Sequence, residues 1–117
     1  MIKNHNGSKL AVTASHKKAM MRSLAKELFL HEKINTTLPR AKEAVRYAEK
    51  LITKAKQADL EAIRVLHGEI NDETVVKKVF EVLVPRYKER NGGYTQIIKA
   101  GLRKGDSAQE AIVRLII

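Results

Sequence analysis

This chain of 117 residues contains four histidines and no cysteine. The histidines are the residues that first suggest metal or nucleophile chemistry. His31-Glu32 begins like a zinc-binding helix motif, but Asn35 stands where that motif needs its second histidine. Ser15 and His16 are adjacent, whereas a nucleophile and its base must converge in space with a third orienting group, and no acidic residue lies near them in sequence. We therefore expect no catalytic residue, no metal site and no cofactor, and we interpret Ser15 as a helix N-cap.

Lysine and arginine are spaced in a more informative way. Two sets recur every fourth residue, and at about 100° per residue each set forms a stripe along a helix, opposite its apolar face. The sets are Lys18, Arg22 and Lys26 in one segment and Lys42, Arg46, Lys50 and Lys54 in the next. Such a stripe is either a solvated helix face or a surface that meets phosphate.

Residues 86–94, Arg-Tyr-Lys-Glu-Arg-Asn-Gly-Gly-Tyr, combine crowded cations with two consecutive glycines. They match neither a dinucleotide-binding fingerprint nor a P-loop. Gly92 and Gly93 allow backbone amides to approach a phosphate, which the preceding cations would neutralise. Tyr87 and Tyr94 can stack on a base or a ribose. A tight turn at the start of a hairpin explains the same residues, so both interpretations stay open.

The elements that position these residues follow from the periodicity of the apolar side chains. In chain order we expect an extended basic tail at 1–14, a helix from Ser15, a short strand within 31–37, a helix capped by Thr37, helices at about 59–67 and 72–83, and strands at 94–102 and 111–117. Asp59 and Asp72 are the expected caps of the later helices, Gly68 separates them, and Pro85 stops the second. This order of helix, strand, three helices and two strands predicts a single α+β domain over 15–117, with two layers in which a small sheet packs against helices.

Positive charge is unevenly distributed along the chain. The net charge is +10, and it divides into +9 over residues 1–56, −3 over residues 57–85 and +4 over residues 86–117. Surfaces this basic usually bind polyanions. We expect one face of the protein to meet phosphate and the acidic middle segment to lie away from it.

A membrane partner is disfavoured by the same composition. Basic amphipathic helices can lie on anionic membranes, but the chain has only 2 phenylalanines and no tryptophan for the buried face of such a helix. No run of about 18 apolar residues is present, and the first residues lack the pattern of a secretory signal. We expect a cytoplasmic protein with no membrane partner and no small-molecule substrate.

Several longer motifs carry a resemblance to a known family. They include Thr13-Ala-Ser-His-Lys-Lys-Ala-Met-Met-Arg-Ser-Leu-Ala, His31-Glu-Lys-Ile-Asn-Thr-Thr-Leu, Arg90-Asn-Gly-Gly-Tyr-Thr and Arg103-Lys-Gly-Asp. In this order, and over nearly the whole chain, the sequence resembles the bacterial large-subunit ribosomal protein seventeen (L17) family. It departs from the family at Ala11-Val12, where Asn-Arg is common, and at Gln96, where the family often has Arg.

The resemblance implies an α+β fold and a structural role without catalysis, located in the ribosome. It implies binding to large-subunit rRNA of the 23S type near the outer opening of the peptide exit tunnel, contact with neighbouring large-subunit proteins, and support of subunit assembly and translation. The basic positions that match RNA-facing residues of the family are His16, Lys17, Arg22, Arg40 and Arg90.

The pattern and the resemblance together select the candidate RNA-binding residues. They are Lys3, Lys9, His16, Lys17, Lys18, Arg22, Lys26, Arg40, Arg46, Arg86, Lys88, Arg90, Gly92, Gly93, Tyr94, Arg103 and Lys104. One alternative is a free-standing basic DNA- or RNA-binding protein, although no helix-turn-helix spacing is present and the cations are spread over many elements. Another is a small RNA-cleaving enzyme, for which His16 and His31 are the only acid and base candidates near the basic helix.

Binding through many dispersed cations should weaken steeply as salt is added, because each neutralised phosphate releases counter-ions. We predict that the affinity for an rRNA fragment falls linearly on a log–log plot against salt, with a slope that scales with the number of phosphates contacted. Fluorescence anisotropy at several salt concentrations measures that slope. A flat dependence would show that shape or apolar contacts dominate.

Overall fold

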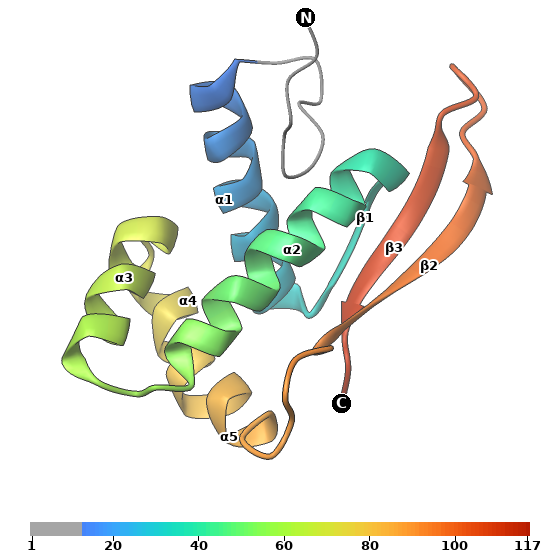
Figure 1. Ribbon diagram of the computed structural model, residues 1–117. Coiled ribbons are helices and arrows are strands. Elements are labelled where there is room, and N and C mark those ends of the chain that lie inside the picture. The colour runs from blue at the N-terminus through green and yellow to red at the C-terminus, as the bar shows by residue number, and fades with distance from the viewer. Residues whose placement is uncertain (1–12) are drawn as a thin grey trace, which may run out of the picture.

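The computed structural model describes residues 13–117 as helices packed on a small sheet (Figure 1). In chain order the elements are α1 (Ala14–His31), β1 (Lys33–Thr37), α2 (Leu38–Ala55), α3 (Leu60–Ile70), α4 (Glu73–Lys78), the π turn η1 (Val79–Leu83), α5 (Val84–Arg86), β2 (Thr95–Leu102) and β3 (Gln109–Leu115). The predicted order of elements and the α+β class are confirmed. Most of the tail predicted at 1–14, with Lys3 and Lys9, lies outside the described residues.

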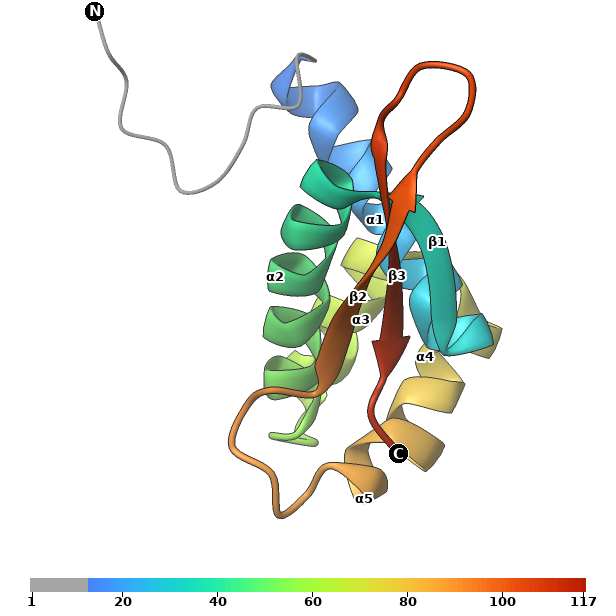
Figure 2. The ribbon, with the colours of Figure 1, turned by 90° about the vertical axis from the view of Figure 1, so that its right-hand side faces the viewer.

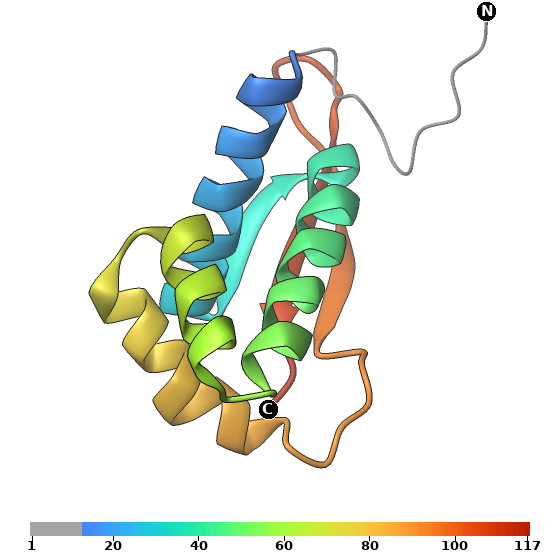
Figure 3. The same ribbon diagram turned by 60° about the vertical axis from the view of Figure 1, so that its left-hand side comes forward.

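The three strands form an antiparallel sheet in the order β1-β3-β2. Side chains alternate between the two faces of a strand, and Ala111, Val113 and Leu115 of the central strand are all buried. Their face packs against α1 and α2, which lie side by side in front of the sheet in Figure 3. The result is the expected two-layer arrangement.

Alanines allow α2 to pack closely against its neighbours. Ala41, Ala44, Ala48 and Ala55 are fully buried at helical spacing, which confirms the apolar face predicted for this helix. Such small side chains leave space for larger ones from the facing elements, among them the fully buried Phe29 of α1. The opposite side of α2 is thereby left for its cations.

Helix caps agree with the sequence at some positions and correct it at others. Asp59 and Asp72 cap α3 and α4 as predicted, each accepting a backbone N–H bond through its carboxylate. Ser15 is not the cap of α1, because Thr13 Oγ1 accepts the His16 N–H at 3.2 Å. Gly68 lies inside α3, which ends at Asn71 with a φ of 55°. Asparagine tolerates this left-handed conformation, so a glycine was not needed there.

Pro85 does not stop the helix that follows Asp72, contrary to the prediction. The helix passes into η1, where the Val84 N–H donates to the Val79 carbonyl five residues back, and continues as α5 to Arg86. Proline lacks an N–H, and its ring clashes with the preceding turn of a regular α-helix, so a wider π turn before it admits the ring. This extension brings Arg86 close to the junction between α1 and β1.

Glu32 forms that junction. Its φ is 63°, its N–H donates to the Leu28 carbonyl, and its own carbonyl accepts the Leu115 N–H at 2.9 Å. Its carboxylate accepts from Arg86 Nη1 at 2.6 Å and lies 3.0 Å from Lys78 Nζ. These cations, Arg86 first, hold the pKa of Glu32 at about 2. Glu32 therefore ends α1, connects it to β1 and attaches this junction to α4 and α5.

Replacing Glu32 with Gln should lower the free energy of unfolding by about 1 to 2 kcal/mol, because two charge-assisted contacts are lost at a partly exposed position. Since folding depresses the pKa from 4.5 to about 2, the wild type keeps this stabilisation above pH 4.5 and loses it as the pH falls toward about 2. Urea unfolding of both proteins at neutral pH and at about pH 3 tests this, and the difference should shrink at the lower pH. Glu27→Gln, on the exposed side of the same helix, is the control and should change stability by at most about 0.5 kcal/mol. A gap between wild type and Glu32→Gln that does not depend on pH would contradict the role of the carboxylate.

Candidate nucleic-acid interface

The basic stripe of α1 is largely neutralised within the protein. Arg22 Nε lies 3.2 Å from Glu69 Oε2 of α3, and Lys26 Nζ lies 3.3 Å from Asp72 Oδ2 at the start of α4. These side chains remain about 40% exposed, but their charges already have partners. Arg22 and Lys26 therefore face α3 and α4, whereas Lys18 is exposed.

Tyr47 of α2 completes this contact between helices. Its hydroxyl donates to Glu69 Oε2, the atom that Arg22 also contacts. Burial and the Glu69 carboxylate raise the pKa of Tyr47, while the bonds from Tyr47 and Arg22 lower the pKa of Glu69. Lys18, exposed one turn before Arg22, adds its field to the same carboxylate. The cluster joins α1, α2 and α3 through one acidic side chain.

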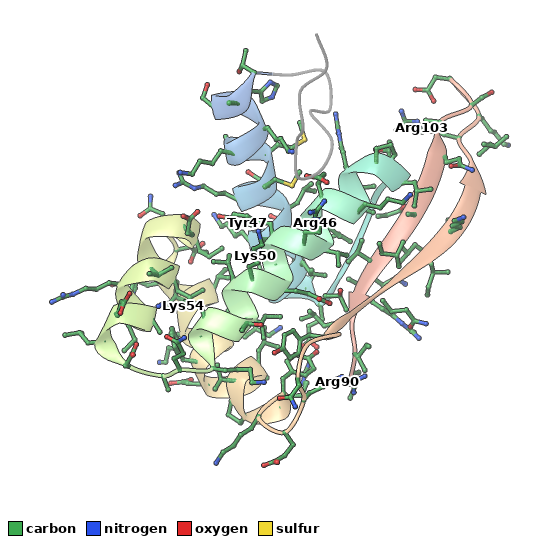
Figure 4. The ribbon with its side chains drawn as sticks, in the orientation of Figure 1. Arg46, Tyr47, Lys50, Lys54, Arg90 and Arg103 are labelled. Carbon is green, nitrogen blue, oxygen red and sulfur yellow. The ribbon has the colours of Figure 1, made fainter. Side chains whose placement is uncertain are left out.

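The stripe of α2 is the less neutralised of the two. Lys42 and Lys50 are exposed and have no ion-pair partner within residues 13–117. Arg46 has only a 3.6 Å contact to Glu43, and Lys54 only a 3.3 Å contact to Glu61, whose side chain is 74% exposed. Figure 4 shows Arg46, Lys50 and Lys54 following one another along the helix. We call Lys42, Arg46, Lys50 and Lys54 the α2 stripe.

Two shallow hollows follow the α2 stripe and shape the surface around it. Lys42 and Arg46 line the first together with Ile97 of β2, so it lies between the helix and the sheet. Arg46, Lys50 and Lys54 line the second, along the helix itself. A series of cations beside concave surface is suited to following a polyanionic backbone.

The acidic segment 57–85 supplies counter-ions to the rest of the chain. Glu61, Glu69 and Asp72 each pair with a cation of α1 or α2. Its net charge of −3 therefore comes partly from acidic side chains that pair with cations inside the protein, and the segment is not simply a separate acidic face. Whether this segment lies away from RNA stays a prediction.

Residues 86–94, which we call the basic turn, carry less unpaired charge than their sequence indicates. Arg86 is paired with Glu32, so one of the three cations Arg86, Lys88 and Arg90 is already neutralised within the protein. Glu32 lies 54 residues away in the chain, which is why the sequence concealed this counter-ion. Lys88 is exposed and has no ion-pair partner among the described residues. The charge available to a ligand here comes from Lys88 and Arg90.

Arg90 and the two glycines form a self-contained turn. Gly92 and Gly93 have φ values of 86° and 64°, a conformation that favours glycine. Arg90 Nε donates to the Gly93 carbonyl at 3.1 Å, and Lys56 Nζ donates to the Arg90 carbonyl. The Nε bond holds the Arg90 side chain against the turn, and the residue as a whole remains exposed. The glycines thus have a structural purpose, and an additional contact with phosphate stays a prediction.

Stacking of bases on the tyrosines is contradicted by the structure. Tyr87 and Tyr94 are 2% and 1% exposed, and their ring centroids lie 5.1 Å apart. The Tyr94 hydroxyl receives a bond from Lys56 Nζ at 3.2 Å. Two large amphipathic rings bury more apolar surface against each other than either would on a turn, so they join the core. Tyr94 is therefore removed from the candidate RNA contacts.

The remaining candidates occupy one end of the described structure. His16 and Lys17 lie in the first turns of α1, where Lys17 Nζ contacts Glu43 at 2.9 Å, and Arg40 is exposed in the first turn of α2. At the tip of the β2–β3 hairpin, Arg103 pairs with Asp106 at 2.6 Å, while Lys104 beside it is exposed. The starts of α1 and α2 and the hairpin tip lie at the upper end in Figure 1.

The alternatives based on metal or acid–base chemistry find no site in the part of the chain that the structure describes. Within residues 13–117 no group of three or more His, Asp or Glu side chains is placed to hold a metal ion. His16 and His31 lie near opposite ends of α1, roughly 22 Å apart at the rise of an α-helix, so they do not converge on one substrate atom. No helix in this range is long and apolar enough to cross a membrane.

Comparison with known proteins identifies the family. The family model for ribosomal protein L17 matches residues 20–116. The chain belongs to the ribosomal protein L17 family. Proteins named large ribosomal subunit protein bL17 are similar to it: 64% identical in Endomicrobium trichonymphae (99% of each chain), 50% in Zymomonas mobilis (94% of this chain, 79% of the relative) and 46% in Dictyoglomus thermophilum (92% and 93%).

L17 membership confirms the resemblance that the motifs predicted. The L17 family consists of ribosomal structural proteins, so the prediction of a non-enzymatic chain is also confirmed.

The candidate RNA-binding residues selected from the sequence omit Lys42 and Lys50, although both belong to the α2 stripe. Sequence spacing gives the two stripes equal weight, and only the tertiary placement of Glu69 and Asp72 separates them.

The two arginines of the turn should behave differently when replaced. Arg86→Ala leaves Glu32 with Lys78 alone, and we expect a loss of about 1 to 3 kcal/mol of stability with little effect on RNA affinity. Arg90→Ala should change stability by only about 0.5 kcal/mol and lower rRNA-fragment affinity about tenfold or more. Thermal unfolding and anisotropy on the same preparations measure both quantities. Unchanged affinity in Arg90→Ala would leave the turn as a structural connection only.

Proposed function

We propose that the chain is a structural constituent of the large ribosomal subunit that binds large-subunit rRNA of the 23S type. In this proposal it is located near the outer opening of the peptide exit tunnel, contacts neighbouring large-subunit proteins, and supports subunit assembly and translation. Relatives that cover nearly the same length carry the name large ribosomal subunit protein bL17, which supports a place in the same particle.

The observation that carries the RNA-binding part is the unequal neutralisation of the two stripes. Arg22 and Lys26 of α1 are paired with acidic residues of the protein, whereas Lys42 and Lys50 of α2 have no such partner among residues 13–117. Exposed cations in a row repel one another unless an anion lies along them. A phosphate backbone is such an anion. The α2 stripe, with Lys88 and Arg90 of the turn, is therefore the proposed centre of the interface.

A free-standing DNA-binding protein is the competing interpretation. Its recognition helix would have to enter the major groove, with residues of one helix reaching base edges. The exposed cations here lie on α2, on the turn and on the hairpin, which suits irregular folded RNA better than one groove. The names of the relatives favour the same choice.

The double variant Lys42→Gln with Lys50→Gln tests the interface. Both side chains are exposed, so stability should stay within about 1 kcal/mol. Affinity for purified large-subunit rRNA should fall about tenfold or more, because each charge-assisted phosphate contact contributes roughly 1.5 kcal/mol or more. The matched control is Arg64→Gln with Lys77→Gln, which removes the same charge from the acidic segment at exposed positions without ion-pair partners among the described residues. If both double variants lose the same rRNA affinity, the α2 stripe contributes only through the net charge of the protein.

Sedimentation separates the ribosomal role from loose DNA binding. A tagged full-length chain should migrate with large subunits after a high-salt wash, since an embedded protein makes many simultaneous contacts. Release at modest salt, together with equal affinity for DNA and rRNA, would favour the free-standing protein.

A further inference from the structure

The face of the sheet that points away from α1 and α2 has no helix over it within residues 13–117. In Figure 2 the strands face the viewer, and the helices lie behind them or beside them. Alternation along β3 places Arg114 on this open face, because Val113 and Leu115 are buried on the other. Arg114 pairs in register with Lys33 of β1 on one side and with Gln96 of β2 on the other. We call Lys33, Arg114 and Gln96 the open-face row.

Two like charges stand directly opposite each other in this row. Lys33 and Arg114 are cross-strand partners, whose Cβ atoms lie about 5 Å apart in an antiparallel pair, and such like-charged pairs destabilise a sheet. Both side chains are exposed, and neither has an ion-pair partner among the described residues. The acidic residue on the same face, Glu110, pairs in register with Thr37 at the far end of β1. The repulsion in the row is therefore left uncompensated.

The arginine of the row is also oriented. Arg114 Nε donates to Gln96 Oε1 at 2.8 Å, and the two terminal nitrogens of the guanidinium have no hydrogen-bond partner among the described residues. A planar guanidinium with both terminal nitrogens available can bind a phosphate through two parallel hydrogen bonds. An arginine present only for solubility needs no such orientation.

A shallow hollow lies beside the row, between the end of α1 and the C-terminal residues. His31, Glu32, Lys33, Gln96 and Arg114 contribute to its lining. Glu32, the acidic side chain named in this lining, already pairs with two cations, Lys78 and Arg86. The hollow is therefore bordered by the unpaired cations Lys33 and Arg114 and by a carboxylate whose charge is already paired.

We propose that the open-face row is a second phosphate-binding surface of the protein, so that the chain contacts rRNA on two sides. This inference rests on the proposed function and deepens it. Because α2 packs on the opposite face of the sheet, RNA that follows the α2 stripe does not itself cover the row. The protein then holds two RNA segments, one along α2 and one across the ends of the three strands.

The test uses the full-length double variant Lys33→Gln with Arg114→Gln, and the control is again Arg64→Gln with Lys77→Gln. We expect affinity for purified large-subunit rRNA to fall about tenfold or more in the row variant. The log–log salt slope should decrease in magnitude by about 1.5, as expected when two phosphate contacts are lost. Circular dichroism and thermal unfolding check that both variants fold. Arg114→Lys, which keeps the charge but not the paired donors, should recover only part of the affinity.

A capture assay separates this proposal from the function on which it rests. One short RNA duplex is immobilised, the protein is bound, and a second, fluorescent duplex is added. The wild type should retain the second duplex, and the row variant should bind the first but not retain the second. The row variant could keep the wild-type affinity, salt slope and capture while the α2 stripe variant binds more weakly. This result would overturn the second surface and leave the proposed function standing. If the row variant binds rRNA like the wild type but loses affinity for acidic peptides, the row belongs to a protein partner. That result would also overturn the proposal of a second phosphate-binding surface.

Discussion

A net charge of +10 on 117 residues is the constraint on which the structure depends. Cations packed this densely oppose folding unless acidic side chains are placed among them. The protein places its acids where helices meet: Lys17 with Glu43, Arg22 with Glu69, Lys26 with Asp72, and Arg86 and Lys78 with Glu32. Each partly exposed pair contributes modestly to stability. Together they decide which cations remain for a ligand, and most of these lie on α2, the turn, the hairpin and the open sheet face, with Lys18, Arg64 and Lys77 outside those places.

The junction at Glu32 shows how backbone and charge are combined. A left-handed residue at the end of α1 would ordinarily be glycine or asparagine, since other side chains are strained there. Here the strain is offset by a carboxylate with two cationic partners and a carbonyl bonded to β3. The π turn before Pro85 serves the same junction, because it extends the helix far enough for Arg86 to reach it. Two local irregularities thus support one long-range contact.

The aromatic residues show what kind of recognition the described surface offers. Tyr87 and Tyr94 are buried against each other, Phe29 is fully buried, and Tyr47 is occupied with Glu69. Phe80 packs against the core. Residues 13–117 therefore offer no exposed Phe or Tyr ring on which a base can stack. In the proposed function, recognition by this part of the chain depends mainly on phosphate charge and on shape, which suits a protein placed among folded RNA segments.

The sequence by itself determined the class of fold, the order of the elements and the family, because apolar periodicity, acidic caps such as Asp59 and long motifs are local signals. Its charge also predicted a polyanionic partner. It did not determine which cations are free, since Glu32 and Glu69 reach their partners across 54 and 47 residues. It likewise misjudged Tyr94 and Pro85, where burial and a π turn override local preference. Ion pairing, burial and strand register are properties of the assembled chain, and these alone distinguish the α2 stripe and the open-face row from equally basic segments.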